Sequence, residues 1–225
     1  MVAPGFVFRE TTHHVVRIFE EFLARDFTLD GSSVVQLTLG ARRDIVPEHL
    51  QVLGATEIQV ESFDFAAYHA MSSEQRESQV LELIEDRLLY LASMHGADSK
   101  PIVDAAAAVR QHGFMLERER TKLARSLPGR EGRIRVYCQL ASGYAERWLA
   151  RLFDKAGHQV HEVVLKERGT VDLRGHFHHS ELAQGSFMLK DDLDRPTLSI
   201  TCVGELIADS SADAQSYLKR HPFGR

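Results

Sequence analysis

The densest run of potentially reactive side chains lies between residues 172 and 181, where one residue separates His176 from His178. On a strand both imidazoles would project from the same side, because side chains alternate along a strand. Such a His-x-His pair supplies two ligands for Zn²⁺ or Fe²⁺, and His161 is a candidate third ligand. The spacing predicts a metal-dependent hydrolase. No Glu-x-x-His or Cys-x-x-Cys motif accompanies it, so histidines exposed on a sheet are the favoured interpretation.

A second group of candidate residues is basic. Arg118, Arg120 and Lys122 alternate along the chain, and if residues 114–127 form a strand they share one face and are placed to contact phosphates. This pattern predicts RNA or nucleotide binding. Acidic residues interrupt the run, however, and no aromatic side chains alternate with it to stack on bases. We therefore favour neutralisation of the protein's own acidic groups over nucleic-acid binding.

The acidic residues are concentrated in the second quarter of the chain. Residues 44–98 contain 2 basic and 11 acidic residues, a net charge of −9, whereas residues 99–135 carry +5. Within the helix predicted below, Glu82, Glu85 and Asp86 share the face opposite the apolar stripe, and Leu89 lies among them. An apolar anchor inside an acidic rim suits a cationic protein partner. A solvated helix face is the simpler alternative.

Signatures of common enzyme classes are missing from the sequence. It contains no Gly-x-x-x-x-Gly-Lys-Ser/Thr loop, no Gly-x-Gly-x-x-Gly turn, no Gly-x-Ser-x-Gly elbow and no His-Glu-x-x-His helix. The net charge of −5 also disfavours a duplex nucleic-acid binder held by bulk positive charge. We therefore expect a non-catalytic protein-binding module without a cofactor. An immunity-type inhibitor that neutralises a cationic toxin is the leading hypothesis.

The expected compartment is the cytoplasm. The N-terminus has neither the basic region nor the apolar region of a signal peptide, and no apolar run is long enough to span a membrane. Two cysteines, Cys138 and Cys202, fit a reducing compartment and are expected to be small buried side chains.

These candidates need a scaffold, which the hydrophobic spacing predicts. Helices are expected over residues 73–95, 101–113 and 143–156, over a short segment from Pro47 to Gly54, and from an N-cap at Thr12 to residue 23. Residues 114–127 fit a strand or a helix. Strands are expected over residues 6–10, 34–39, 56–65, 134–140 and 160–165, and as short strands from residue 170 to 203.

The predicted fold class is α/β or α+β, with mixed sheets and about four covering helices. Residues 8–39 and 136–165 both follow a strand, helix, strand order, which suggests two similar α/β halves. The expected halves are residues 1–127, with the long acidic helix, and residues 128–225, packed closely enough to behave as one domain.

Overall fold

The computed structural model describes residues 4–24, 27–41, 48–61, 63–127, 132–169, 173–183, 186–203 and 206–208. The chain divides into two compact units. Unit 1 contains residues 1–116 together with the hairpin tip Leu140–Ala145, and unit 2 contains Glu117–Gln139 and Glu146–Arg225. The fold belongs to the α+β class, as predicted, because the α-helices of the described residues lie in unit 1 and the sheets are mixed or antiparallel.

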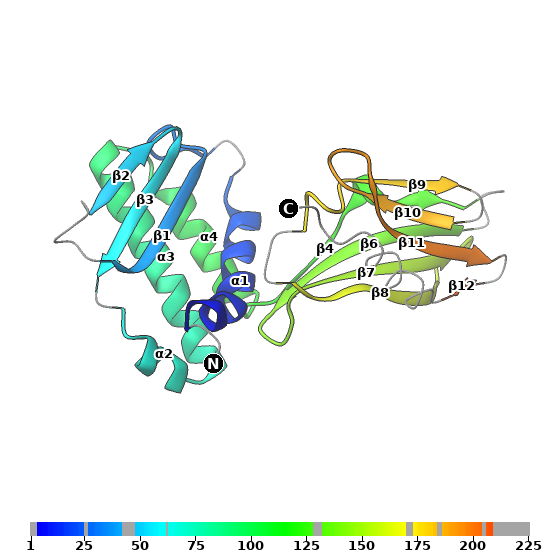
Figure 1. Cartoon of the computed structure of the whole chain (residues 1–225), viewed down its shortest axis with the longest axis horizontal. Helices are drawn as coiled ribbons and strands as arrows, with labels where there is room; N and C mark the ends of the chain where they lie inside the picture. Colours follow the sequence, from blue (N-terminus) through cyan, green and yellow to red (C-terminus); the bar gives the residue numbers. More distant parts are fainter. Residues whose placement is uncertain are drawn as a thin grey trace. The chain divides into compact units, whose positions relative to one another are not determined.

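The described residues of unit 1 form four helices and a three-stranded sheet (Figure 1). Its elements, in chain order, are α1 (Pro4–Phe22), β1 (Val34–Ala41), β2 (His49–Val52), β3 (Ala55–Glu61), α2 (Phe65–Ala70), α3 (Ser73–His95) and α4 (Lys100–Gln111). The strand order is β1-β3-β2. The central strand β3 is parallel to β1 and antiparallel to β2.

The helices cover one face of this sheet, with α3 and α4 behind it in Figure 1. Thr56, Ile58 and Val60 alternate along β3 and are buried, which identifies them as the face toward the helices. The helices bury residues of their own against one another and the sheet, among them Val15, Ile18, Phe19, Val80, Leu81, Ile84, Leu88, Leu91, Ile102, Ala105 and Val109.

The described residues of unit 2 form strands in two sheets. Its elements are β4 (Leu116–Glu119), a 3₁₀ turn η1 (Thr121–Leu123), β5 (Arg125–Ser126), β6 (Gly132–Ala141), β7 (Ala145–Asp154), β8 (Gln159–Gly169), β9 (His179–Ala183), β10 (Ser186–Lys190), β11 (Pro196–Val203) and β12 (Leu206–Ala208). One sheet has the order β4-β6-β7-β8, with β5 on β6, and the other has the order β12-β11-β10-β9.

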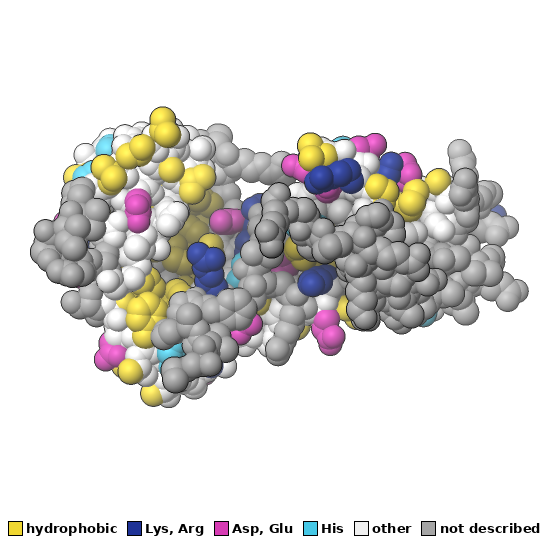
Figure 2. Space-filling model, viewed as in Figure 1, with side chains coloured by type: hydrophobic (Ala, Val, Ile, Leu, Met, Phe, Trp, Pro, Cys, Tyr) yellow, Lys and Arg dark blue, Asp and Glu magenta, His cyan; other side chains and the backbone are white. Residues whose placement is uncertain are grey.

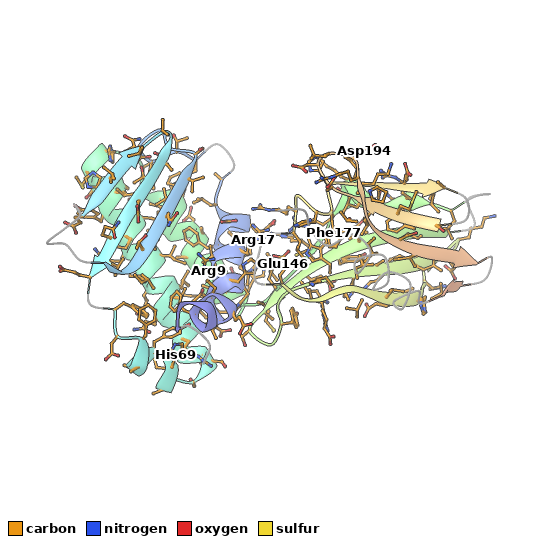
Figure 3. All side chains as sticks on the ribbon, viewed as in Figure 1. Arg9, Arg17, His69, Glu146, Phe177 and Asp194 are labelled. Atoms are coloured by element: carbon orange, nitrogen blue, oxygen red, sulfur yellow. The ribbon has the colours of Figure 1, made fainter. Side chains whose placement is uncertain are left out.

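Trp148 is among the largest fully buried side chains of the described residues. Its indole is 1 % exposed, and the ring of Phe177, labelled in Figure 3, packs edge-on against it at 4.9 Å between centroids. Its Nε1 donates a hydrogen bond of 2.6 Å to Glu146, whose same oxygen also accepts from the amide of Leu173. The 173–177 turn is thereby attached to β7.

Three predictions about the first 60 residues are wrong. Residues 6–10 are not a strand but part of α1, and Thr12 lies inside that helix, where its hydroxyl donates to the carbonyl of Phe8. The helix predicted over residues 47–54 is not found in the described residues 48–54, because His49–Val52 is a strand that turns directly into β3. Pro4 near the helix start is consistent with the earlier beginning of α1, since proline is tolerated in the first turn.

The predicted helix over residues 143–156 is also wrong, because this segment is strand β7. The strand–helix–strand layout of residues 136–165 is therefore absent, and the described part of unit 2 contains no α-helix. The interpretation as two similar α/β halves fails for this reason. Residues 114–127, which fit either a strand or a helix in the sequence, contain β4, η1 and β5 in the structure.

Candidate protein-binding surface

Helix α3 carries the predicted partner-binding residues, and its boundaries are set by local signals. Ser72 forms a capping box with Gln75: the Ser72 hydroxyl accepts from the amide of Gln75, and the Gln75 side chain accepts from the amide of Ser72. At the other end Gly96 adopts the left-handed conformation, with φ of 64°. The helix is therefore held in a defined position along its length.

The face of α3 that points away from the core carries acidic side chains. Glu82 and Asp86 are exposed, while Glu85 and Leu89 are half-buried at its margin. The spacings of four and three residues from Glu82 to Asp86 to Leu89 make these side chains neighbours on the helix. The four residues predicted from the sequence thus lie on one side of one helix. We call them the α3 surface.

The protein's own arginines contact two of these carboxylates. Arg110 of α4 donates to Glu85 with a distance of 2.7 Å, and Arg87 lies 3.0 Å from Asp86 and 3.8 Å from Glu48. No partner is found for Glu82 among the described residues. Glu82 is therefore the carboxylate most available to another molecule, and the charge of the α3 surface is smaller than its acid count indicates.

Other acids of residues 44–98 have structural roles elsewhere in unit 1. Asp64 caps the N-terminus of α2, Glu57 accepts a hydrogen bond from Thr38 on the sheet, and Glu77 accepts from Nε2 of the fully buried His14 at 2.8 Å. The net charge of −9 is thus distributed over several parts of unit 1. The α3 surface holds only three of these acids.

The predicted histidine site is not assembled on a strand. His176 lies in a turn and His178 precedes β9, where its ring contacts that of His179, whereas His161 is on β8. No group of three or more His, Cys, Asp or Glu side chains that could hold a metal ion is found among the described residues. The strand geometry expected for the His-x-His pair is therefore wrong, and nothing in the described geometry supports the hydrolase interpretation.

The predicted phosphate-binding residues do not share one strand. Arg118 is on β4, but Arg120 precedes the η1 turn, with its guanidinium 5.8 Å from the centroid of the Trp148 ring, and Lys122 lies within that turn. The strand face that would have aligned the three cations ends at Glu119. The geometric basis of the nucleic-acid interpretation is therefore lost.

A network of charged and polar side chains crosses the outer face of the β4-β6-β7-β8 sheet. Arg151 on β7 donates to Glu117 on β4 at 2.6 and 2.8 Å and to Glu162 on β8 at 2.6 Å. Its guanidinium lies 4.3 Å from the ring centroid of Tyr137. Hydrogen bonds from Arg151, opposed by burial and joined by a bond from Gln139, lower the pKa of Glu117. The network links all four strands, because Tyr137 and Gln139 belong to β6.

A second polar cluster fixes the turn at residues 30–32, which precedes β1. Thr56, which is fully buried, donates to the carboxylate of Asp30, and the amide of Ser32 donates to the same carboxylate at 2.9 Å. Burial raises the pKa of Asp30, but these hydrogen bonds, together with the electrostatic interaction with His95, outweigh it, so that the pKa is lowered overall. The cluster attaches the 30–32 turn to the central strand.

Sequence reasoning missed an exposed apolar group on the other face of the unit 1 sheet. Val34, Ala55 and Val52 lie side by side across the three strands, and Leu53 at the β2–β3 turn is fully exposed with φ of 52°. Figure 2 shows hydrophobic side chains gathered along this end of the sheet. Apolar and polar residues alternate in the sequence after His49, which is typical of a strand, but a helix was expected there instead.

No helix in the described part of the chain is long and apolar enough to cross a membrane. No family model matches the chain, and neither a curated protein nor a solved structure matches it.

Proposed function

We propose that the chain is a non-catalytic protein-binding module that docks on a cationic protein through the α3 surface. The observation that carries this proposal is the pair of exposed carboxylates of Glu82 and Asp86 beside the half-buried Leu89 on one side of a capped helix. Carboxylates of this kind speed the approach of a basic surface, and a central apolar side chain adds affinity once water is excluded.

The internal ion pairs are compatible with this role. The side chains of Arg110 and Asp86 are 46 % and 67 % exposed, and ion pairs at such positions contribute about 1 kcal/mol or less to stability. A lysine or arginine of a partner therefore competes with Arg110 for Glu85 and with Arg87 for Asp86 at little energetic cost. Glu82 requires no exchange and makes the first contact.

An immunity-type inhibitor of a cytoplasmic toxin is the form of this function that we favour. A nuclease or similar toxin grips nucleic acid through basic groups, and the α3 surface would occupy those groups and block access to them. This mechanism requires that the protein recognise the toxin and cover its basic groups, but it requires no catalysed reaction. It predicts that inhibition and binding depend on the same carboxylates.

Co-purification from the native host at low salt tests the proposal. The wild-type chain is expected to retain a stoichiometric basic protein, and a Glu82→Lys/Asp86→Lys variant is expected to lose it. A Glu167→Lys/Asp192→Lys variant provides the matched control, because it changes the net charge equally at exposed positions in unit 2. Equal retention by both variants, or no retained basic protein with the wild-type chain, contradicts the proposal.

A further inference from the structure

We infer that the free edge of strand β1 pairs with β1 of a second copy of this chain. In the three-stranded sheet of unit 1, β1 is a terminal strand that pairs with β3 on one side and with no described strand on the other. A free edge presents unpaired backbone amide and carbonyl groups, which form a template for another strand. The inference concerns self-association and is independent of the α3 surface.

The composition of β1 favours pairing. Its eight residues, Val-Val-Gln-Leu-Thr-Leu-Gly-Ala, include no charged residue and no proline. Proteins protect free edges with charged side chains, with proline, or by keeping the strand short. The strand β1 has none of these protections.

The other edge strands show the protections that β1 lacks. The edge strand β2 has four residues and β12 has three, so both are short. In unit 2, β4 carries Glu117, Arg118 and Glu119, β8 carries Glu162 and Lys166, and β9 carries Glu181. Among the edge strands that the structure describes, only β1 is both long and uncharged.

The side chains of β1 are also incompletely covered. Val35, Leu37 and Leu39 share the helix-facing side with Thr56, Ile58 and Val60, which are their registered partners on β3. The three β3 side chains are buried, whereas the three β1 side chains are only half-buried. The apolar layer therefore continues to the edge of the sheet and is only partly covered there, where an added strand would extend it.

A second copy fits this edge better than a foreign charged strand. An antiparallel pair with its two-fold axis at Leu37 places Val35 opposite Leu39 and Gln36 opposite Thr38 of the other copy. Apolar side chains then meet on the helix-facing side and uncharged polar ones on the open side, since alternation keeps each set on its own face. A two-fold interface uses the same patch on both subunits, and an uncharged strand has no self-repulsion. The product is a six-stranded sheet.

Sedimentation equilibrium of the full chain tests this inference, with a Gln36→Lys variant and a Gln159→Lys control. Both glutamines are exposed on edge strands, but Gln159 is on β8. We expect a dimer for the wild-type chain and for Gln159→Lys. We expect a monomer for Gln36→Lys, because a lysine on β1 gives this edge the charged side chain that other edge strands carry. A dimer that persists in a folded Gln36→Lys variant overturns the inference.

Hydrogen exchange of the wild-type chain supplies a test without substitution. Alternate amides of β1 that point to the free edge should be protected at high protein concentration and exchange faster on dilution, while the amides of β3 should not change. Equal exchange at both concentrations, with a monomeric mass, overturns the inference. The alternative occupant of the edge is then an extended segment of another protein.

Discussion

Nη2 of Arg110 lies 2.7 Å from Oε2 of Glu85, and this contact joins α4 to α3 at the margin of the α3 surface. The two residues are 25 positions apart in the sequence. The charge that α3 presents to another molecule is therefore set in part by a neighbouring helix. The pair also gives a direct way to change that charge without altering α3.

Replacing Arg110 with glutamine should have little effect on folding. Arg110 is 46 % exposed and Glu85 19 %, and such an ion pair contributes less than about 1 kcal/mol. We expect the free energy of unfolding, measured in urea by circular dichroism, to fall by no more than that amount. A loss of several kcal/mol would show that the pair supports the packing of α4 rather than only the surface charge.

The helices of unit 1 with clear local signals were predictable from the sequence. The 73–95 and 101–113 predictions correspond to α3 and α4, because apolar spacing, a serine cap and Gly96 all agree. The 143–156 prediction failed for a physical reason. Strand β7 is buried on both sides, so that Trp148, Leu149 and Leu152 fit a helical period as well as a strand.

The α3 surface was only partly predictable. Helical periodicity places Glu82, Glu85, Asp86 and Leu89 together, and this requires no tertiary information. The contact of Arg110 with Glu85 depends on how α4 packs against α3, which periodicity does not report. The exposed Leu53 was missed because a helix was expected from Pro47 to Gly54, whereas Leu53 lies in the turn between β2 and β3.

Replacing Thr56 with valine should destabilise unit 1. Thr56 is fully buried, and its hydroxyl donates to Asp30. Removing a buried donor to a charged group costs about 1–3 kcal/mol, so we expect a loss in that range in urea unfolding. Thr38→Val is the matched control, because Thr38 donates to Glu57 from a half-buried position. An equal loss in the two variants would contradict the importance of the Asp30 cluster.

Unit 2 should lose stability in acid through Glu117. The folded pKa of Glu117 lies below its ordinary value of 4.5, chiefly because Arg151 donates to it. A lowered folded pKa means that this stabilisation is complete above pH 4.5 and is lost as the pH falls through the folded pKa. Urea unfolding followed by the fluorescence of Trp148, the chain's single tryptophan, measures this dependence.

A Glu117→Gln variant should show a shallower decline in stability over the same acid range. Glu167→Gln is the control, since Glu167 is an exposed residue of β8, and it should reproduce the wild-type decline. If Glu117→Gln and the wild-type chain decline in parallel, the Arg151 network does not govern the acid sensitivity of unit 2.

Replacing Leu53 with asparagine should stabilise unit 1. Leu53 has φ of 52° in the turn between β2 and β3, and Gly54 follows with φ of 79°. Two positive φ values define the turn type that favours Asn-Gly, and a non-glycine residue held in this region stores about 1–2 kcal/mol. We expect a gain of up to about 1 kcal/mol in urea unfolding.

The control for this substitution is Leu193→Asn. Leu193 is 67 % exposed in a turn, but its own φ is not positive. This variant should leave stability unchanged. Equal gains at the two positions would mean that removal of an exposed leucine, and not relief of backbone strain, explains the result.

The association rate of the chain with the basic protein that it retains, measured as a function of salt, tests the central claim most directly. The account predicts that Glu82→Lys/Asp86→Lys slows association at low salt by about tenfold or more and flattens its salt dependence, because the steering charges are reversed. Arg110→Gln should accelerate association, and Glu167→Lys/Asp192→Lys should leave the rate near that of the wild-type chain. If both double variants associate at the same rate, the α3 surface is not the docking site.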